Sequence, residues 1–575
     1  MATVPLSDAG SAQHGGQRGR RVMLPRPSLR TAGVVVILTA LAVAGVVSCL
    51  SLGLSPDRVV NSFSRIGKFL ARAVPVDFSE PLVLLQLTLL TLAVVICGTL
   101  FAVILSVPVA YCAARNTTPH ASLRWIARAM TVLARSTPEI VILIIMATLV
   151  SGGPVWPSIV AIGLHSVGMV GKLFADAIEQ IDEGPRIAIR AAGGGRLQEF
   201  VSGVLPQVLP SWIATALHRN DINLRGSVIL AIVGMPGIGY ELKASIERLD
   251  YRRALAAAII LFVLCVLMEI VATVLRSMIL ARPAAGRSLG ARLSRALHQR
   301  GESAAPAGSD HPTARRRLSA PWNGRRVQVA LIGWSLVAVL VWSLWYAQIN
   351  WADVLGFWAA VPQRISTLFP LGFGDTPLPK VVELFWQTIY IALAGTLIAF
   401  VFSAPIGSLA ARNVAPNSWV HAVFRLVLVV IRGIPELLLA IVLILATGFG
   451  PIAGAFALGL GGIGLLGKLF ADSFEEVSPG PEIALRAVGA SRTQVYASAT
   501  VPQASQAIVG HVFYMLDSNI RAATVLGVVG AGGVGFIMFE AASRSQYNVV
   551  LTIALVIMAI VLVLEGMAMW VRKSM

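Results

Sequence analysis

Two stretches of the chain share one pattern: Gly184–Gln207 reads GPRIAIRAAGGGRLQEFVSGVLPQ, and Gly480–Gln503 reads GPEIALRAVGASRTQVYASATVPQ. The copies keep Gly, Pro, Ile, Ala, Arg, Ala, Gly, Arg, Gln, Ser, Pro and Gln at identical spacing, 296 residues apart. Each copy is charged, whereas the sequence around it is very apolar. This repeat predicts two membrane halves, each with one loop that projects from the membrane.

The composition is that of a membrane protein. Of the 575 residues, 56% are hydrophobic and 13% are charged, and the mean hydropathy is +0.78. A soluble enzyme is far more polar. Apolar stretches of the roughly 20 residues that cross a bilayer as a helix recur along the whole chain. We predict an all-α polytopic membrane protein with about twelve spans, near residues 32–54, 82–112, 126–150, 156–175, 208–239, 254–280, 327–349, 383–411, 420–447, 451–471, 508–538 and 549–571.

Basic residues decide the predicted orientation, because short loops rich in Lys and Arg stay in the cytoplasm. The N-terminal tail, residues 1–30, and an arginine-rich linker, residues 282–326, are both predicted to be cytoplasmic. They bound two transmembrane domains, 31–281 and 327–575, and an even number of spans in each places the C-terminus inside too. The same bias accounts for the net charge of +18, and we expect no nucleic-acid partner.

The repeat extends far beyond the charged loop. KLFAD occurs at Lys172–Asp176 and returns at Lys468–Asp472, and Ala114–Asn116 returns as Ala411–Asn413. Both halves have the same number of predicted spans in the same orientation. This pattern indicates a parallel duplication with a pseudo-twofold axis along the membrane normal, and hence a central pathway between the halves.

The repeated loop has the local signals of two short helices joined by a turn. A proline suits the first turn of the first helix in each copy, and Gly193 and Gly489 suit a left-handed residue that ends it. Ser491 can cap the second helix, which we expect to run until Pro502, and the first copy has glycine at the capping position. The sequence therefore predicts a helix-turn-helix that serves as a docking knob.

The loop resembles the cytoplasmic loop of the permease subunits of ATP-binding-cassette (ABC) importers. Gly193 with Pro206, and Gly489 with Pro502, have the thirteen-residue separation of that family's pattern. Isoleucine replaces the leading acidic residue of the pattern in both copies, although the Arg-Ala-x-Gly centre remains. The resemblance implies a tandem duplication of the six-helix type I importer transmembrane domain.

Within that family the chain resembles the phosphonate-type permeases. The resemblance covers most of both halves through KLFAD, RAxGxxRxQ, the segment R-x-x-P-E and a late glycine-rich block. The second half matches better: it reads Asp517, Asn519, Arg521 and then Gly530 to Gly535, whereas the first half has GMPG from Gly234 in the last block. A permease of this family usually has one such domain and works as a dimer, so this chain looks like two of them fused.

The resemblance implies the partners and the mechanism. Two copies of a cytoplasmic ATPase would each grip one loop, an extracytoplasmic phosphonate-binding protein would deliver the ligand, and the halves would alternate access across the bacterial plasma membrane. ATP and Mg²⁺ would be bound by the ATPase, and no cofactor is expected in this chain. The implied coupling residues are Ile187, Ala188, Arg190, Ala191, Gly193, Arg196 and Gln198, and Ile483, Ala484, Arg486, Ala487, Gly489, Arg492 and Gln494.

Charged residues inside the predicted spans are further candidates, because charge is costly in a membrane. Each has an opposite charge four residues away, about one helical turn, so we expect pairs that face each other. The pairs are Arg135 with Glu139, Lys172 with Asp176, Asp221 with Arg225, Arg432 with Glu436, Lys468 with Asp472 and Asp517 with Arg521.

Two roles are open for these groups. The pairs either neutralise themselves and brace the loops, or they line the substrate pathway or its gate. Guanidinium groups bind phosphonate oxygens through two parallel hydrogen bonds, which favours contact of Arg225 or Arg521 with substrate. Arg135 and Arg432 precede prolines and suit a cytoplasmic gate. The candidates for the pathway or gate are Arg135, Glu139, Asp221, Asn223, Arg225, Arg432, Glu436, Asp517, Asn519 and Arg521.

Other functions have weaker signals. The run GGIGLLGK from Gly461 resembles a phosphate-binding loop, but Leu469 stands where Ser or Thr must hold Mg²⁺, so ATP hydrolysis is expected on a separate subunit. The histidines and the four cysteines form no metal-spaced cluster, and we expect neither a metal site nor an enzyme. An importer for methionine, a quaternary amine or phosphate, or an ion-coupled secondary transporter, stays open as an alternative.

Overall fold

The computed structural model describes residues 29–54, 64, 65, 67, 71–149, 155–279, 324–448 and 450–574. The predicted tail before residue 29 and the predicted linker from residue 282 to 323 lie outside these residues. Every regular element within them is helical. The first half comprises α1 (Leu29–Ser51), α3 (Pro81–Ala113), α4 (Ala121–Ser136), α5 (Glu139–Leu149), α6 (Val155–Glu179), α9 (Leu205–Gly226), α10 (Ile238–Glu247) and α11 (Tyr251–Ile279).

The second half repeats this order and includes one further described helix, α14. It comprises α13 (Gly324–Tyr346), α14 (Trp351–Ile365), α15 (Leu378–Ala410), α16 (Ser418–Gly433), α17 (Glu436–Thr447), α18 (Pro451–Glu475), α21 (Val501–Leu526), α22 (Val534–Ser543) and α23 (Tyr547–Ser574). Among the described residues, nine helices are long and apolar enough to cross a membrane, or eleven if each of two bent pairs is one span. The apolar part of α13, Ala330–Tyr346, lies in the predicted span 327–349 and brings the number to twelve. The predicted membrane fold is confirmed.

Two predicted spans are each broken into two helices. The bend between α4 and α5 is 93° and that between α16 and α17 is 77°. Each break contains a proline, Pro138 or Pro435, and the residue before it is extended: Thr137 has φ −82° and ψ 126°, and Ile434 has φ −82° and ψ 119°. A proline excludes the helical conformation from the residue before it, which explains the break. The spans predicted at 126–150 and 420–447 are each such a bent pair, with the bend at the proline.

The fifth span of each half also differs from the prediction. In the second half one helix of 40 residues runs from Arg492 to Ala531, so the second helix of the loop continues through Pro502 into the membrane span instead of ending there. Proline is tolerated at this point because a π-helical turn, Tyr496–Thr500, precedes it. The span then ends near Gly530, whose φ is +106°, and α22 begins as a separate helix within the range predicted as one span.

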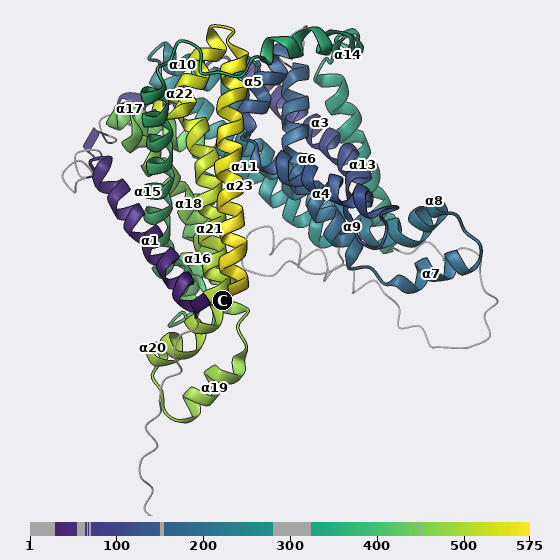
Figure 1. Ribbon diagram of the computed structural model, residues 1–575, viewed down its shortest axis with the longest axis vertical. Coiled ribbons are helices and arrows are strands. Elements are labelled where there is room, and N and C mark those ends of the chain that lie inside the picture. Colours follow the sequence, from purple (N-terminus) through teal and green to yellow (C-terminus); the bar gives the residue numbers. More distant parts are fainter. Residues whose placement is uncertain are drawn as a thin grey trace, which may run out of the picture.

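The first helix of each half packs on the other half. The core of each half is a long pair, α3 with α6 and α15 with α18, but α1 packs against α15 and α13 packs against α3. Figure 1 shows this exchange, with α1 in purple beside α15 and α13 in teal beside α3. Gly45 of α1 allows the close approach, since an added Cβ would lie 3.2 Å from Leu397 of α15. The two predicted domains are therefore interlocked.

Candidate functional site

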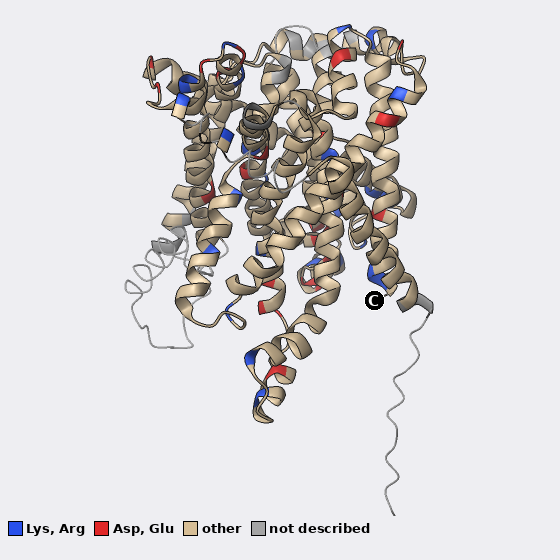
Figure 2. Cartoon of the chain, turned by 90° about the vertical axis from the view of Figure 1, so that its left-hand side faces the viewer, with Lys and Arg blue, Asp and Glu red and all other residues tan. Residues whose placement is uncertain are grey.

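Each repeated loop forms a projecting helical hairpin. In the first copy, α7 (Glu183–Ala191) is followed by α8 (Arg196–Gln198), and in the second, α19 (Pro479–Ala487) is followed by α20 (Arg492–Val495). Both hairpins extend beyond the same end of the helical body, on opposite sides of it (Figure 1). Figure 2 shows positive and negative residues on a projecting hairpin below the helices.

The predicted turn residues have the predicted conformation. Gly193 has φ +82° and Gly489 has φ +84°, and each follows its first helix as a left-handed residue. An added Cβ would meet no atom within 4 Å at either position. Glycine is therefore required by the backbone conformation and not by crowding.

The start of the second loop helix differs between the copies. Ser491 caps α20: its backbone N–H donates to Gln494 Oε1 at 2.8 Å, and its hydroxyl accepts from the backbone N–H of Gln494. In the first copy the backbone N–H of Gly195 donates to Gln198 Oε1 at 2.9 Å, but glycine has no side chain to complete the box. The predicted weaker cap of the first copy is confirmed.

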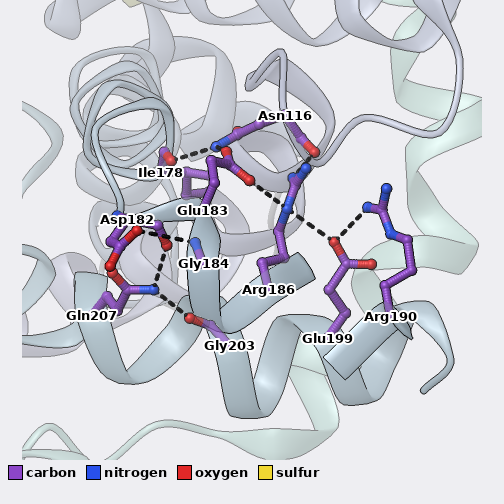
Figure 3. A network of polar contacts seen from close by, with 10 residues as sticks. All are labelled: Asn116, Ile178, Asp182, Glu183, Gly184, Arg186, Arg190, Glu199, Gly203 and Gln207. Atoms are coloured by element: carbon purple, nitrogen blue, oxygen red, sulfur yellow. Dashed lines mark hydrogen bonds and ion pairs between the residues drawn. The ribbon is translucent and has the colours of Figure 1, made fainter. Parts of the chain in front are cut away.

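A network of ion pairs and hydrogen bonds holds the first hairpin to the body (Figure 3). Arg186 pairs with Glu183 at 2.7 Å and with Glu199 at 3.1 Å, and it donates to the backbone carbonyl of Asn116. Asn116 in turn donates to Glu183 at 2.9 Å and to the carbonyl of Ile178 at 2.7 Å. The hairpin is therefore fixed to the ends of α3 and α6.

Arg190 extends this network to the surface. Its guanidinium donates to Glu199 at 2.8 Å, and this hydrogen bond raises the pKa of Arg190. At the base of the hairpin, Gln207 accepts from the Asp182 N–H at 3.0 Å and donates to the carbonyl of Gly203 at 2.7 Å (Figure 3).

The second hairpin uses the same anchor with the opposite charge. Glu482 stands at the repeat position of Arg186, and it accepts from Thr500 at 2.6 Å and from Asn413 at 3.1 Å. Asn413 also donates to the carbonyl of Phe474 at 2.7 Å, as its counterpart does in the first half. The attachment is therefore the same in both halves, although the side chains that make it have diverged.

The outer surface of both hairpins is open and partly apolar. Leu197 is 75% exposed and Val488 is 81% exposed, and Ile187 and Ile483 are more than half exposed. Exposed apolar side chains on a short rigid element are typical of a docking surface. Every residue predicted to couple to an ATPase is exposed: Ile187, Ala188, Arg190, Ala191, Gly193, Arg196, Gln198, Ile483, Ala484, Arg486, Ala487, Gly489, Arg492 and Gln494.

Two arginines of the bent helix pairs form ion pairs across the halves. Arg135, near the end of α4, contacts Glu565 of α23, and Arg432, near the end of α16, contacts Glu269 of α11. The two ion pairs occupy equivalent positions in the repeat, so the structure contains a reciprocal pair of contacts between the halves. Sequence reasoning missed both acids, although each is the one acid of a largely apolar predicted span and the two are 296 residues apart.

These contacts correct two predicted pairs. Arg135 does not pair with Glu139, nor Arg432 with Glu436, among the described contacts. The reason is the break between them, because four residues make one turn only if the helix is continuous. A glycine in α6 positions the arginine: an added Cβ at Gly168 would lie 2.6 Å from the backbone nitrogen of Arg135.

The pairs within the fifth span form as predicted. Asp221 and Arg225 are 2.9 Å apart, and Asp517 and Arg521 are 2.7 Å apart. Arg225 makes two further contacts, with Glu269 at 3.3 Å and with the backbone carbonyl of Arg432 at 2.6 Å. Arg225 therefore joins α9 to α11 of its own half and to the end of α16 in the other half.

The KLFAD pairs do not form. Lys172 makes no ion pair with Asp176, nor Lys468 with Asp472, in the described part of the chain. Asp472 instead contacts Arg425 of α16 at 2.8 Å, and the same guanidinium reaches Glu475 at 3.0 Å. The planar guanidinium of Arg425 thus bridges two acids on one face of α18.

The two asparagines brace the interior of each half. Asn223 donates to Thr99 of α3 at 3.0 Å and accepts from Ser166 of α6 at 3.1 Å. Asn519 donates to Thr396 of α15 at 2.8 Å, and no described partner reaches its carbonyl oxygen. Both side chains are buried and join helices of the same half.

The glycine-rich run from Gly461 lies inside α18. An added Cβ at Gly464 would meet the backbone nitrogen of Arg432 at 2.6 Å, and one at Gly467 would meet Leu428 at 2.6 Å. These glycines let α16 approach α18, as small residues do in membrane helices. Among the described residues, no group of three His, Cys, Asp or Glu side chains is placed to hold a metal ion.

Two interlocked bundles, with bent spans at their contact and one docking hairpin each, define a membrane permease that is coupled to partners outside the bilayer. The chain belongs to the family described as the binding-protein-dependent transport system inner membrane component, which matches residues 106–279 and 403–575. It is thus a multi-pass inner-membrane permease subunit of an ABC importer and not an enzyme.

Three relatives illustrate the range of similarity. The phosphate-import permease protein PhnE of Mycolicibacterium smegmatis is 37% identical over 536 residues, which cover 92% of this chain and 93% of that protein. The phosphite transport system permease protein PtxC of Stutzerimonas stutzeri is 39% identical over 230 residues, 40% of this chain and 83% of that protein. A probable D-methionine permease, MetI of Pasteurella multocida, is 24% identical over 189 residues, 31% of this chain and 87% of that protein.

Proposed function

We propose that this chain carries a phosphorus oxyanion, a phosphonate, phosphite or phosphate, into the cell as the complete permease of an ATP-driven importer. The observation that carries this proposal is the similarity to a phosphate-import permease along nearly the whole chain, at 37% identity. Similarity to phosphite permeases extends the proposed substrate class to related anions. The similarity to methionine permeases is weaker and covers less of the chain.

In this proposal an ATPase subunit docks on each hairpin, and an extracytoplasmic binding protein delivers the anion to the opposite face. ATP and Mg²⁺ are held by the ATPase pair. The exposed apolar tips at Leu197 and Val488 support docking, and the buried anchors at Asn116 and Asn413 support transmission of force into the spans. The start of α1 and the end of α23 lie at the end of the molecule from which the hairpins project, which supports a cytoplasmic position for both termini (Figure 1).

The substrate is tested with the complex of this chain, its ATPase and its binding protein in lipid nanodiscs. We expect methylphosphonate, phosphite or phosphate to stimulate ATP hydrolysis only when the binding protein is present, and methionine to have no effect. Stimulation by methionine alone would contradict the proposed substrate class. Uptake that follows an ion gradient and needs no ATP would contradict the importer.

Docking is tested at the two left-handed glycines. A β-branched residue in the left-handed conformation costs about 1–2 kcal/mol or more, so Gly193→Val with Gly489→Val should distort both turns. We expect loss of ATPase binding and of stimulated hydrolysis. Gly195→Ala is the matched control, because Gly195 has φ −73° and a Cβ there meets only the Gln198 side chain, at 3.9 Å. Normal assembly and coupling in the double valine variant would contradict docking at the hairpins.

A further inference from the structure

Arg219 of α9 is a buried arginine whose described contacts are all neutral. The residue is 6% exposed, its Nε donates to Ser166 Oγ at 2.8 Å, and its Nη1 lies 3.5 Å from the sulfur of Met169. These contacts use two of the five N–H donors of a guanidinium. Among the described residues no carboxylate forms an ion pair with it. A buried cation in this state is costly unless an anion completes its surroundings.

Arg219 lies near the contact between the halves. Its charge is within electrostatic reach of Glu139 in its own half and of Tyr514 and Arg521 in the other half. The helix α5, which begins at Glu139, packs against α21 and α23 of the second half. Glu139 directly follows the break between α4 and α5. The acid whose charge acts on Arg219 therefore stands at a bend in the chain.

The arginine is present in one half only. At the 296-residue offset, Met515 replaces Arg219 and Gly462 replaces Ser166. The two replacements belong together, because an added Cβ at Gly462 would lie 2.6 Å from the terminal methyl of Met515. A hydroxyl and a guanidinium in the first half thus correspond to a glycine and a thioether in the second, and both pairs are packed. The second half therefore packs at this position without a charge.

We propose that Arg219 binds the transported phosphorus oxyanion as it passes between the halves, with Ser166 positioning the guanidinium. The inference rests on the proposed function, because it names a contact inside the permease for the same anion. Phosphate, phosphite and phosphonate all present oxygens that a guanidinium binds through two parallel hydrogen bonds. Arg521, whose described ion pair is with Asp517, adds positive charge from the opposite half.

Glu139 competes with the anion for this arginine. Its carboxylate lies beside the backbone of Gly226, 3.4 Å from the place where a Cβ would stand, and it is within electrostatic reach of the guanidinium without an ion pair to it among the described contacts. Removal of its charge should therefore strengthen anion binding. Glu436, its counterpart, faces a half in which methionine replaces the arginine, so the same change there should have a smaller effect.

The test uses the full complex of permease and ATPase, without the binding protein, so that ³³P-labelled phosphate and labelled phosphite report binding to the permease itself. The principal variant is the double change Ser166→Gly with Arg219→Met, which copies into the first half the pair that packs in the second. Met515→Leu is the control, since it conserves volume in the equivalent place. Uptake into liposomes with the binding protein, and basal ATP hydrolysis, are measured in parallel.

We expect the double variant to weaken anion binding at least tenfold and to abolish most uptake, while assembly and basal hydrolysis persist. Glu139→Gln should tighten binding several-fold, and Glu436→Gln less. If the wild-type complex takes up phosphorus anions and the double variant binds and transports them equally well, the inference is overturned while the proposed function stands. If the double variant does not assemble, Glu139→Gln decides, and unchanged or weaker binding overturns the inference. Failure of the wild-type complex to transport any phosphorus anion would instead contradict the proposed function.

Discussion

Neutralising the two acids of the cross-half ion pairs should have unequal effects, although the acids occupy equivalent positions. Glu269→Gln removes the partner of Arg432 and one partner of Arg225, whereas Glu565→Gln removes the partner of Arg135 only. Losing one partner of a buried pair costs about 3–5 kcal/mol, and losing one of an exposed pair costs less than about 1 kcal/mol. These side chains are 17–32% exposed, which is between the two cases.

The expected losses of stability lie between those of a buried and of an exposed ion pair. We expect Glu565→Gln to lower the free energy of unfolding by about 1–2 kcal/mol, and Glu269→Gln by about 3–4 kcal/mol because two guanidinium groups lose a partner. The measurement is equilibrium unfolding in mixed detergent and dodecyl sulfate micelles, followed by tryptophan fluorescence. Glu540→Gln is the control, since its ion pair with Arg544 is about half exposed and should contribute less than about 0.5 kcal/mol.

A double-mutant cycle isolates the contact itself. Arg432→Gln, Glu269→Gln and the combined variant should give a coupling energy of at least about 1.5 kcal/mol, because the two side chains touch. A coupling energy below about 0.5 kcal/mol, or equal losses for the two glutamine variants, would refute the view that these contacts hold the halves together.

Three further expectations concern local contacts. Asn223→Ala should cost about 1 kcal/mol more than Asn519→Ala in the same unfolding measurement, because the first asparagine bonds to two helices and the second to one. Ser491→Ala should remove about 1 kcal/mol of cap stability and speed hydrogen exchange in α20, whereas Gly195→Ser should slow exchange at the start of α8. Gly168→Ala should cost about 1–3 kcal/mol, since its Cβ would press on the α4 backbone, and an unchanged midpoint would contradict that packing.

The sequence predicted the parts of the fold that depend on local signals. Long apolar runs indicated the spans, and the spacing of the repeat indicated the hairpins and their left-handed glycines. Partners across the molecule were not predicted. Arg135 was matched to Glu139 by helical spacing, but Pro138 breaks the helix between them and the true partner, Glu565, comes from the other half. A comparison of the two copies could have found the acids of the last spans, because each is the one acid of its predicted span and the two are at the repeat offset.

Arg219 could not be found in that way, because comparison of the copies selects what they share. The shared residues serve what both halves do alike: turn each hairpin at a left-handed glycine, bend at Pro138 and Pro435, and pair across the contact. A ligand that binds on the pseudo-twofold axis does not need the same residue from both halves. When two separate copies form a permease, every change appears twice. In one fused chain, one half can carry an arginine at the position where the other half carries a methionine, so the pathway can bind an anion from one side. The divergence at Arg219 and Met515 is therefore where the fusion gives this permease a property that a symmetric dimer lacks.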